Sequence, residues 1–105
     1  MNVRDGEKQD TCYQPLNIAG GVNLILKKQD LENEQLNIEI FLVPRQYTLK
    51  EGIQLSVSLE DNQETIISEQ GADLLEGISI KIDKGDIFDI IVEYKNDIYR
   101  NSFYA

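Results

Sequence analysis

Side chains that commonly carry catalysis are scarce in this sequence. It contains no histidine, so acid–base catalysis and metal binding through an imidazole are excluded. The single cysteine, Cys12, lies in a polar stretch without a neighbouring base that could generate its thiolate. The motifs G-x-S-x-G, G-x-x-x-x-G-K and C-x-x-C are absent. We therefore expect no enzymatic activity, no catalytic residue and no cofactor.

Carboxylates are the one abundant reactive group, with nineteen Asp and Glu in 105 residues. Asp83, Asp86 and Asp89 recur at every third position around Gly85, but this spacing differs from that of an EF-hand loop. We expect a solvated turn and no metal, with calcium at these three aspartates as the open alternative. No tryptophan is present to stack on a sugar beside a pair of catalytic acids.

The charge balance restricts the partners. Ten Lys and Arg stand against nineteen Asp and Glu, a net charge of −9, which repels nucleic acid and anionic membrane surfaces. We therefore expect neither as a partner, while a basic protein remains compatible. The first ten residues lack the apolar core of a signal peptide, and one cysteine cannot form an intrachain disulfide. These features predict a cytoplasmic protein.

Alternation of apolar and polar residues dominates from residue 22 onward, and it predicts β-strands. The clearest case places Ile53, Leu55 and Val57 on one face, with Gln54 and Ser56 on the other. Such a strand has one dry and one wet face, as in an antiparallel sheet. The predicted strands are 22–26, 36–43, 53–59, 65–68, 78–82, 87–94 and 98–104, with a two-residue hairpin turn at Asn96–Asp97.

Seven short antiparallel strands with frequent turn signals predict an all-β fold. We expect a β-sandwich, immunoglobulin-like or a related Greek key, or else a small barrel. Residues 1–15 are polar and are predicted to be a flexible N-terminal arm, which leaves 16–105 as a single domain. Within residues 61–75 a short helix is the competing interpretation, because Asp61 and Glu64 have the spacing of a capping box.

Apolar and aromatic residues on faces expected to be wet suggest an interface. Phe41 and Val43 point away from the dry face of their strand, and Tyr and Arg, common in binding hot spots, cluster near the end of the chain. The alternative is that these side chains form a second core layer or lie under a covered edge. The predicted partner-binding residues are Phe41, Val43, Tyr94, Tyr99, Arg100, Phe103 and Tyr104.

Four segments, GGVNLIL, LKEGIQLSVSLED, GISIKIDKGDIFDIIVEY and YRNSFYA, are similar to parts of a cyanobacterial family of uncharacterised proteins, the domain of unknown function numbered eighteen twenty-two. The stretch Leu49 to Asp61 resembles an aliphatic strand of that family, and Gly85 to Ile90 resembles a turn that leads into a later strand. The resemblance covers residues 20–105, the β-rich C-terminal half of the family. It implies a bacterial, cytosolic and non-enzymatic protein, and it assigns no functional residue.

The leading functional hypothesis is a non-catalytic module that binds another protein, or a second copy of itself, through an exposed strand edge or the C-terminal aromatic hairpin. One alternative is a small acidic inhibitor, encoded by a phage or mobile element, that mimics the charge of nucleic acid. A second is a carbohydrate-binding sandwich, by analogy of fold alone.

Overall fold

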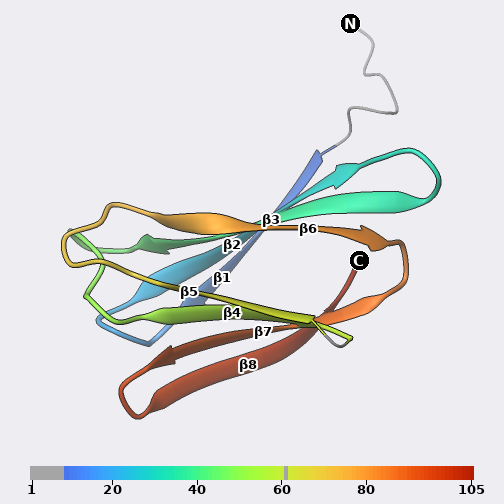
Figure 1. Cartoon of the computed structure of the whole chain (residues 1–105). Coiled ribbons are helices and arrows are strands. Elements are labelled where there is room, and N and C mark those ends of the chain that lie inside the picture. Colours follow the sequence, from blue (N-terminus) through green and yellow to red (C-terminus); the bar gives the residue numbers. More distant parts are fainter. Residues whose placement is uncertain (1–8, 61) are drawn as a thin grey trace, which may run out of the picture.

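The computed structural model describes residues 9–60 and 62–105, which form eight antiparallel strands (Figure 1). None of the described residues belongs to a helix that could cross a membrane. The strands are β1 (Gln9–Leu16), β2 (Val22–Asp30), β3 (Gln35–Pro44), β4 (Gln54–Leu59), β5 (Asn62–Ile67), β6 (Leu75–Asp83), β7 (Ile87–Tyr94) and β8 (Asp97–Tyr104).

The strands form two four-stranded sheets stacked as a sandwich, which confirms the predicted fold class. One sheet has the order β1-β2-β3-β6 and the other β5-β4-β7-β8. The chain passes from β3 to the second sheet for the β4–β5 hairpin and then returns, so that β6 pairs with β3. β5 and β6 are edge strands of different sheets and lie next to each other across the sandwich. The spatial order β7-β4-β5-β6 is therefore a Greek-key arrangement.

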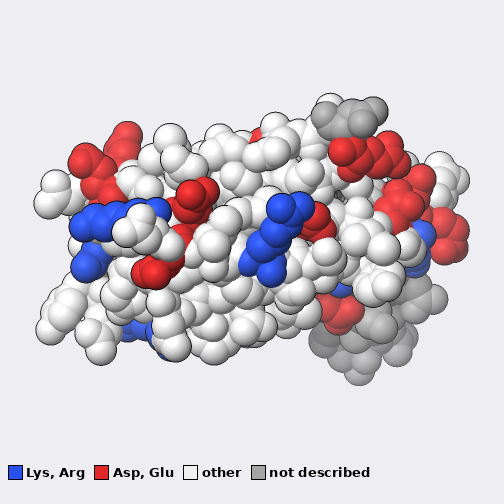
Figure 2. Space-filling view, turned by 90° about the horizontal axis from the view of Figure 1, so that it is seen from below, with Lys and Arg blue, Asp and Glu red and all other residues white. Residues whose placement is uncertain are grey.

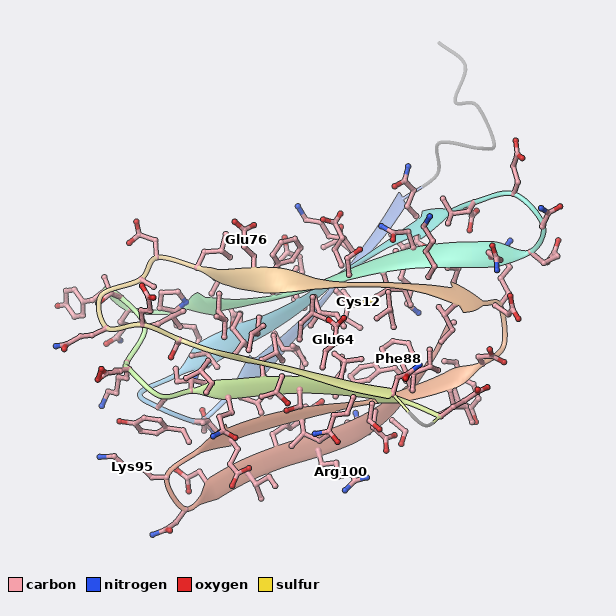
Figure 3. The ribbon with its side chains drawn as sticks, viewed as in Figure 1. Cys12, Glu64, Glu76, Phe88, Lys95 and Arg100 are labelled. Atoms are coloured by element: carbon pink, nitrogen blue, oxygen red, sulfur yellow. The ribbon has the colours of Figure 1, made fainter. Side chains whose placement is uncertain are left out.

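The core lies between the sheets and consists mainly of apolar residues from the predicted alternating strands, to which Leu16, Ile18, Leu49 and Leu75 add from outside those strands. Every second side chain of the central strands is buried, for example Leu24 on β2, Ile38 on β3 and Leu55 on β4. Phe88 is the largest fully buried side chain, and Figure 3 shows it between the two layers. Since opposite residues in an antiparallel pair share a face, the inward set continues from strand to strand.

Strand β1 corrects the predicted arm. Residues 9–15 of that arm pair with β2 along an unbroken register that runs from Gln9↔Gln29 to Leu16↔Val22. The sequence carried no signal for this strand because the side chains from Asp10 to Pro15 are all exposed, so no alternation arises. Pro15 fits at an edge, where one side of the strand has no ladder. Residues 1–8 of the predicted arm lie outside the described residues.

The segment with two interpretations is a strand followed by a loop. Residues 62–67 form β5, and the described residues of 61–75 contain no helix; Asp61 lies outside them. The loop after β5 is fixed by Ser68, whose side chain is buried. Its hydroxyl donates to the carbonyl of Lys50 and accepts the N–H of Ile53 at 2.9 Å.

Arg45 fastens the loop between β1 and β2. Its Nη2 donates to the carbonyl of Leu16 at 3.0 Å and to Oδ1 of Asn17 at 2.9 Å. The guanidinium packs against Gly21, where a Cβ would lie 2.8 Å from Nε and the φ angle is +102°. Only glycine accommodates both this contact and this backbone conformation.

Candidate interaction surface

The seven predicted partner-binding residues do not form one surface. Tyr94, Tyr99 and Phe103 point inward and pack against the core, because Tyr99 pairs with Val92 and Phe103 with Phe88. Arg100 and Tyr104 lie on the opposite, outer face of β8. Phe41 and Val43 lie on the outer face of the other sheet. The residues therefore separate into a core layer and two outer faces.

The inward residues behave as the second core layer that was the alternative interpretation. The rings of Phe88 and Phe103 stack with centroids 5.7 Å apart and planes 22° apart. The Tyr94 ring is half-buried, with Nζ of Lys95 5.3 Å from its centroid. The hydroxyl of Tyr99 is buried and has no hydrogen-bond partner among the described residues. These three side chains offer a partner little accessible area.

Phe41 belongs to an apolar row on the outer face of the first sheet. The register aligns it with Ile25 of β2 and, through Ile25, with Tyr13 of β1. Nζ of Lys27 lies 5.1 Å from the Phe41 centroid and covers part of the ring, while Tyr13 is 68% exposed. Val43 is half-buried beside this row. Tyr13 went unrecognised because its strand was not predicted.

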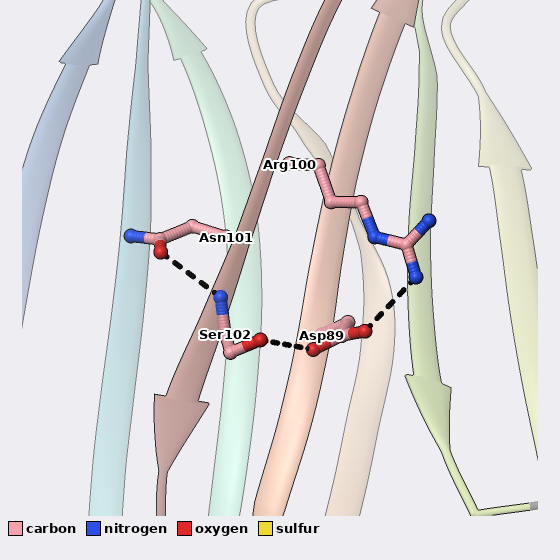
Figure 4. A network of polar contacts seen from close by, with 4 residues as sticks. All are labelled: Asp89, Arg100, Asn101 and Ser102. Carbon is pink, nitrogen blue, oxygen red and sulfur yellow. Dashed lines mark hydrogen bonds and ion pairs between the residues drawn. The ribbon is translucent and has the colours of Figure 1, made fainter.

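The outer face of β7 and β8 carries a network of polar side chains (Figure 4). Asp89 accepts hydrogen bonds from the hydroxyl of Ser102 and from Nη2 of Arg100 at 3.1 Å. Both bonds, and first of all the one from Ser102, hold the pKa of Asp89 below its ordinary value of 3.8. The ion pair holds the guanidinium of Arg100 over β7, away from the free edge of β8.

Exposed apolar side chains surround this network. Ile98 is 63% exposed and Tyr104 68% exposed on β8, and Ile87 of β7 lies opposite Tyr104. Figure 2, seen from below Figure 1, shows the side of the molecule on which β7 and β8 lie. Its carboxylates are densest toward the right-hand end, and in its middle a basic side chain lies next to an acidic one among uncharged residues. Exposed apolar side chains around a paired Asp and Arg, on a protein of net charge −9, mark a candidate contact area.

The free edge of β8 presents unpaired backbone groups. The two-residue turn is Lys95–Asn96, one residue earlier than predicted, because Tyr94 pairs with Asp97. Ala105, the residue after β8, bonds through its backbone to the two residues that precede β7. Its N–H donates to the carbonyl of Asp86 at 2.8 Å, and its carbonyl accepts the N–H of Gly85 at 3.1 Å. Odd-numbered residues of β8 therefore direct their N–H and C=O groups toward β7, and even-numbered residues direct theirs toward the free edge.

Two of these edge groups are already satisfied by side chains. Oδ1 of Asn101 accepts the N–H of Ser102 at 3.0 Å, as Figure 4 shows. Nζ of Lys28, which reaches across from β2, donates to the carbonyl of Tyr104 at 2.8 Å. The N–H and C=O groups of Ile98 and Arg100 have no such cap among the described residues. The half of the edge next to the hairpin is therefore the open half.

Two of the other three edge strands carry features that hinder pairing with a foreign strand, and the third, β5, is shorter than β8. β1 carries Pro15, β5 has six residues, and β6 has a register shift against β3 near Gly77. β8 has eight residues in unbroken register and contains no proline, glycine or lysine. Prolines, bulges and lysines are the usual devices that block an edge. β8 lacks all of them.

The remaining chemical candidates do not assemble into a site in the described residues. No group of three or more Cys, Asp or Glu side chains is arranged there to hold a metal ion. Of the three aspartates for which calcium was the open alternative, Asp89 is bound by Arg100 and Ser102, and Asp83 accepts a hydrogen bond from Gln35 at 3.1 Å. Cys12 is exposed on β1.

Comparison with known proteins adds no assignment: no family model, no curated protein and no solved structure matches the chain. The similarity to the cyanobacterial family therefore stays a prediction.

Proposed function

We propose that the protein is a non-catalytic binding module that recognises another protein by strand addition at the free edge of β8. The observation that supports this most directly is the open half of that edge, where Ile98 and Arg100 direct four backbone groups outward. An extended segment of the partner would hydrogen-bond to these groups and extend the β5-β4-β7-β8 sheet by a fifth strand.

Side chains next to the edge are needed for affinity, because the backbone hydrogen bonds alone contribute too little binding free energy. Four hydrogen bonds contribute about 0.5–1.5 kcal/mol each, which falls short of the roughly 8 kcal/mol of a micromolar complex. Burial of Ile98 adds an apolar contribution at the open half, and a partner segment that continued along β8 would also cover Tyr104 and Ile87 at the other end of the strand. Their positions predict that the partner strand places apolar side chains over this face.

A matched pair of variants at one position tests the mode of binding. Arg100→Pro removes the N–H that points to the free edge, and it also removes the ion pair with Asp89. Arg100→Gln removes the ion pair and keeps the N–H. Partners captured from the host should be retained by Arg100→Gln and lost by Arg100→Pro, provided that circular dichroism shows both variants folded.

Amide hydrogen exchange then identifies the contact. Strand addition predicts slower exchange at the amides of Ile98 and Arg100 in the complex, with the amide of Tyr99, already directed toward β7, less affected. Equal capture by the two variants, or protection confined to other strands, would refute the proposal. Binding that weakens steeply with salt would instead favour charge mimicry, and a mass twice that of the monomer would identify a second copy as the partner.

A further inference from the structure

A groove opens between β5 and β6, on the side of the sandwich opposite the β8 edge. Each sheet ends there in an edge strand whose outer side is unpaired within the described residues. The groove has a volume of about 350 Å³, in the range of small-ligand sites. It is lined by Val57, Leu59, Asn62, Gln63, Glu64, Ile80 and Lys81.

The register explains why the sandwich stays open at this point. Leu59 pairs with Asn62 and Val57 with Glu64, so two polar side chains of β5 occupy inward positions. An apolar residue at either position would cover Ile80 of β6. Because Asn62 and Glu64 occupy these positions instead, Leu59 and Ile80 are only half-buried, and the buried Val57 forms the floor of the groove. Figure 3 shows Glu64 between the two layers.

The groove thus combines an apolar floor with one carboxylate, that of Glu64, which occupies an inward position of β5 but is exposed to solvent. No ion pair or side-chain hydrogen bond joins Glu64 to another described residue. Lys81 alternates with the inward Ile80 and lies at the rim, on the outer side of β6. The negative net charge of the protein adds to the attraction that Glu64 exerts on a cation.

We propose that this groove binds the side chain of an arginine presented by a partner peptide. The methylene stem would pack on Leu59 and Ile80, and the guanidinium would form a paired hydrogen bond with the Glu64 carboxylate. Guanidinium suits the site better than ammonium because it is planar, weakly hydrated and able to donate two parallel bonds. The amide oxygen of Asn62, which like Glu64 occupies an inward position of β5, is a further acceptor at the same wall. This site is independent of the β8 edge.

Capped amino acids test the proposal without a known partner. N-acetyl-arginine methylamide, titrated at low salt, should shift the methyl resonances of Leu59 and Ile80 with saturation in the millimolar range. N-acetyl-citrulline methylamide has the same stem without the charge and should bind at least fivefold more weakly. Glu64→Gln should weaken arginine binding at least fivefold, and Glu76→Gln, on an exposed position of β6, should leave it unchanged.

Three results would overturn the proposal. Equal shifts with arginine and citrulline would mean that the charge plays no part. Arginine binding that survives Glu64→Gln would place the cation elsewhere on the acidic surface. Self-association of Glu64→Gln without any arginine binding by the wild type would identify Glu64 as an inward charge that only blocks edge pairing.

Discussion

Tyr99→Phe should make the protein more stable, because the hydroxyl of Tyr99 is buried without a hydrogen-bond partner among the described residues. Folding removes this hydroxyl from water without giving it a hydrogen-bond partner among the described residues. The cost of burying an unsatisfied polar group is about 1–3 kcal/mol. The ring itself packs against the core and stays in place in the variant, so the packing contribution is retained.

The gain is large enough to measure in a domain of this size. Each kcal/mol changes the melting temperature of such a domain by about 4–8 °C. Urea denaturation of wild type and Tyr99→Phe, with calorimetry as a second method, should show a higher midpoint with an unchanged slope. Tyr104→Phe is the matched control, because that side chain is 68% exposed and its hydroxyl stays in water.

A loss of stability in Tyr99→Phe would refute the reasoning. It would mean that the hydroxyl is satisfied in solution, for example by a trapped water molecule, and that its removal breaks a bond. A change of the same size in Tyr104→Phe would show that the effect comes from the tyrosine hydroxyl in general and not from its burial.

Three further predictions concern the core, the outer face of β7 and β8, and the loop between β3 and β4. Leu55→Asp places a charge at a fully buried position and should prevent folding, while Gln54→Lys, exposed on the same strand beside Glu93, should change the free energy of unfolding by less than about 0.5 kcal/mol; circular dichroism distinguishes the two outcomes. The difference in free energy of unfolding between wild type and Asp89→Asn should become smaller as the pH falls from about 5 to 2. The folded-state pKa of Asp89 is lowered, so its contribution is present above the ordinary value of 3.8 and lost as the carboxyl is protonated; a constant difference in urea midpoints across that range would contradict this. Tyr47→Gly should raise the free energy of unfolding by about 0.5–1 kcal/mol, because Tyr47 is 95% exposed and has a φ of 60°, which glycine adopts without strain; a lower urea midpoint would show that the ring makes a stabilising contact.

The alternation predicted the fold wherever a strand has one buried face. Ile53, Leu55 and Val57 are buried, and the predicted strand 87–94 agrees residue for residue with β7. The pattern works because a strand that covers a core must present an apolar residue at every second position. β1 escaped the same analysis because Leu16 is the only one of its described side chains that is buried. A strand held mainly by backbone hydrogen bonds does not need an apolar residue at every second position, so hydrophobic alternation does not predict it.

The inward direction of Tyr99 and Phe103 was accessible from the sequence. A two-residue turn at either Asn96–Asp97 or Lys95–Asn96 places odd residues of the last strand opposite even residues of 87–94. Those even residues are the apolar ones, so Tyr99 and Phe103 must share the core face. By contrast, the caps on the β8 edge depend on where Asn101 and Lys28 reach in three dimensions, and no residue spacing contains that information.

The hydrogen bonds from Arg45 to Leu16 and Asn17 bear on whether two copies of this chain could exchange strand β1. Among the described residues β1 pairs with β2 alone and contributes one buried side chain, Leu16, to the core, so detaching β1 would break one ladder of hydrogen bonds and expose little apolar surface. The same strand from another molecule would restore that ladder bond for bond, which is the condition for domain swapping. Residues 17–21 would be the hinge of such a swap. Arg45 ties both Leu16 and Asn17 to the body of the sandwich, and it thereby keeps β1 folded onto its own chain.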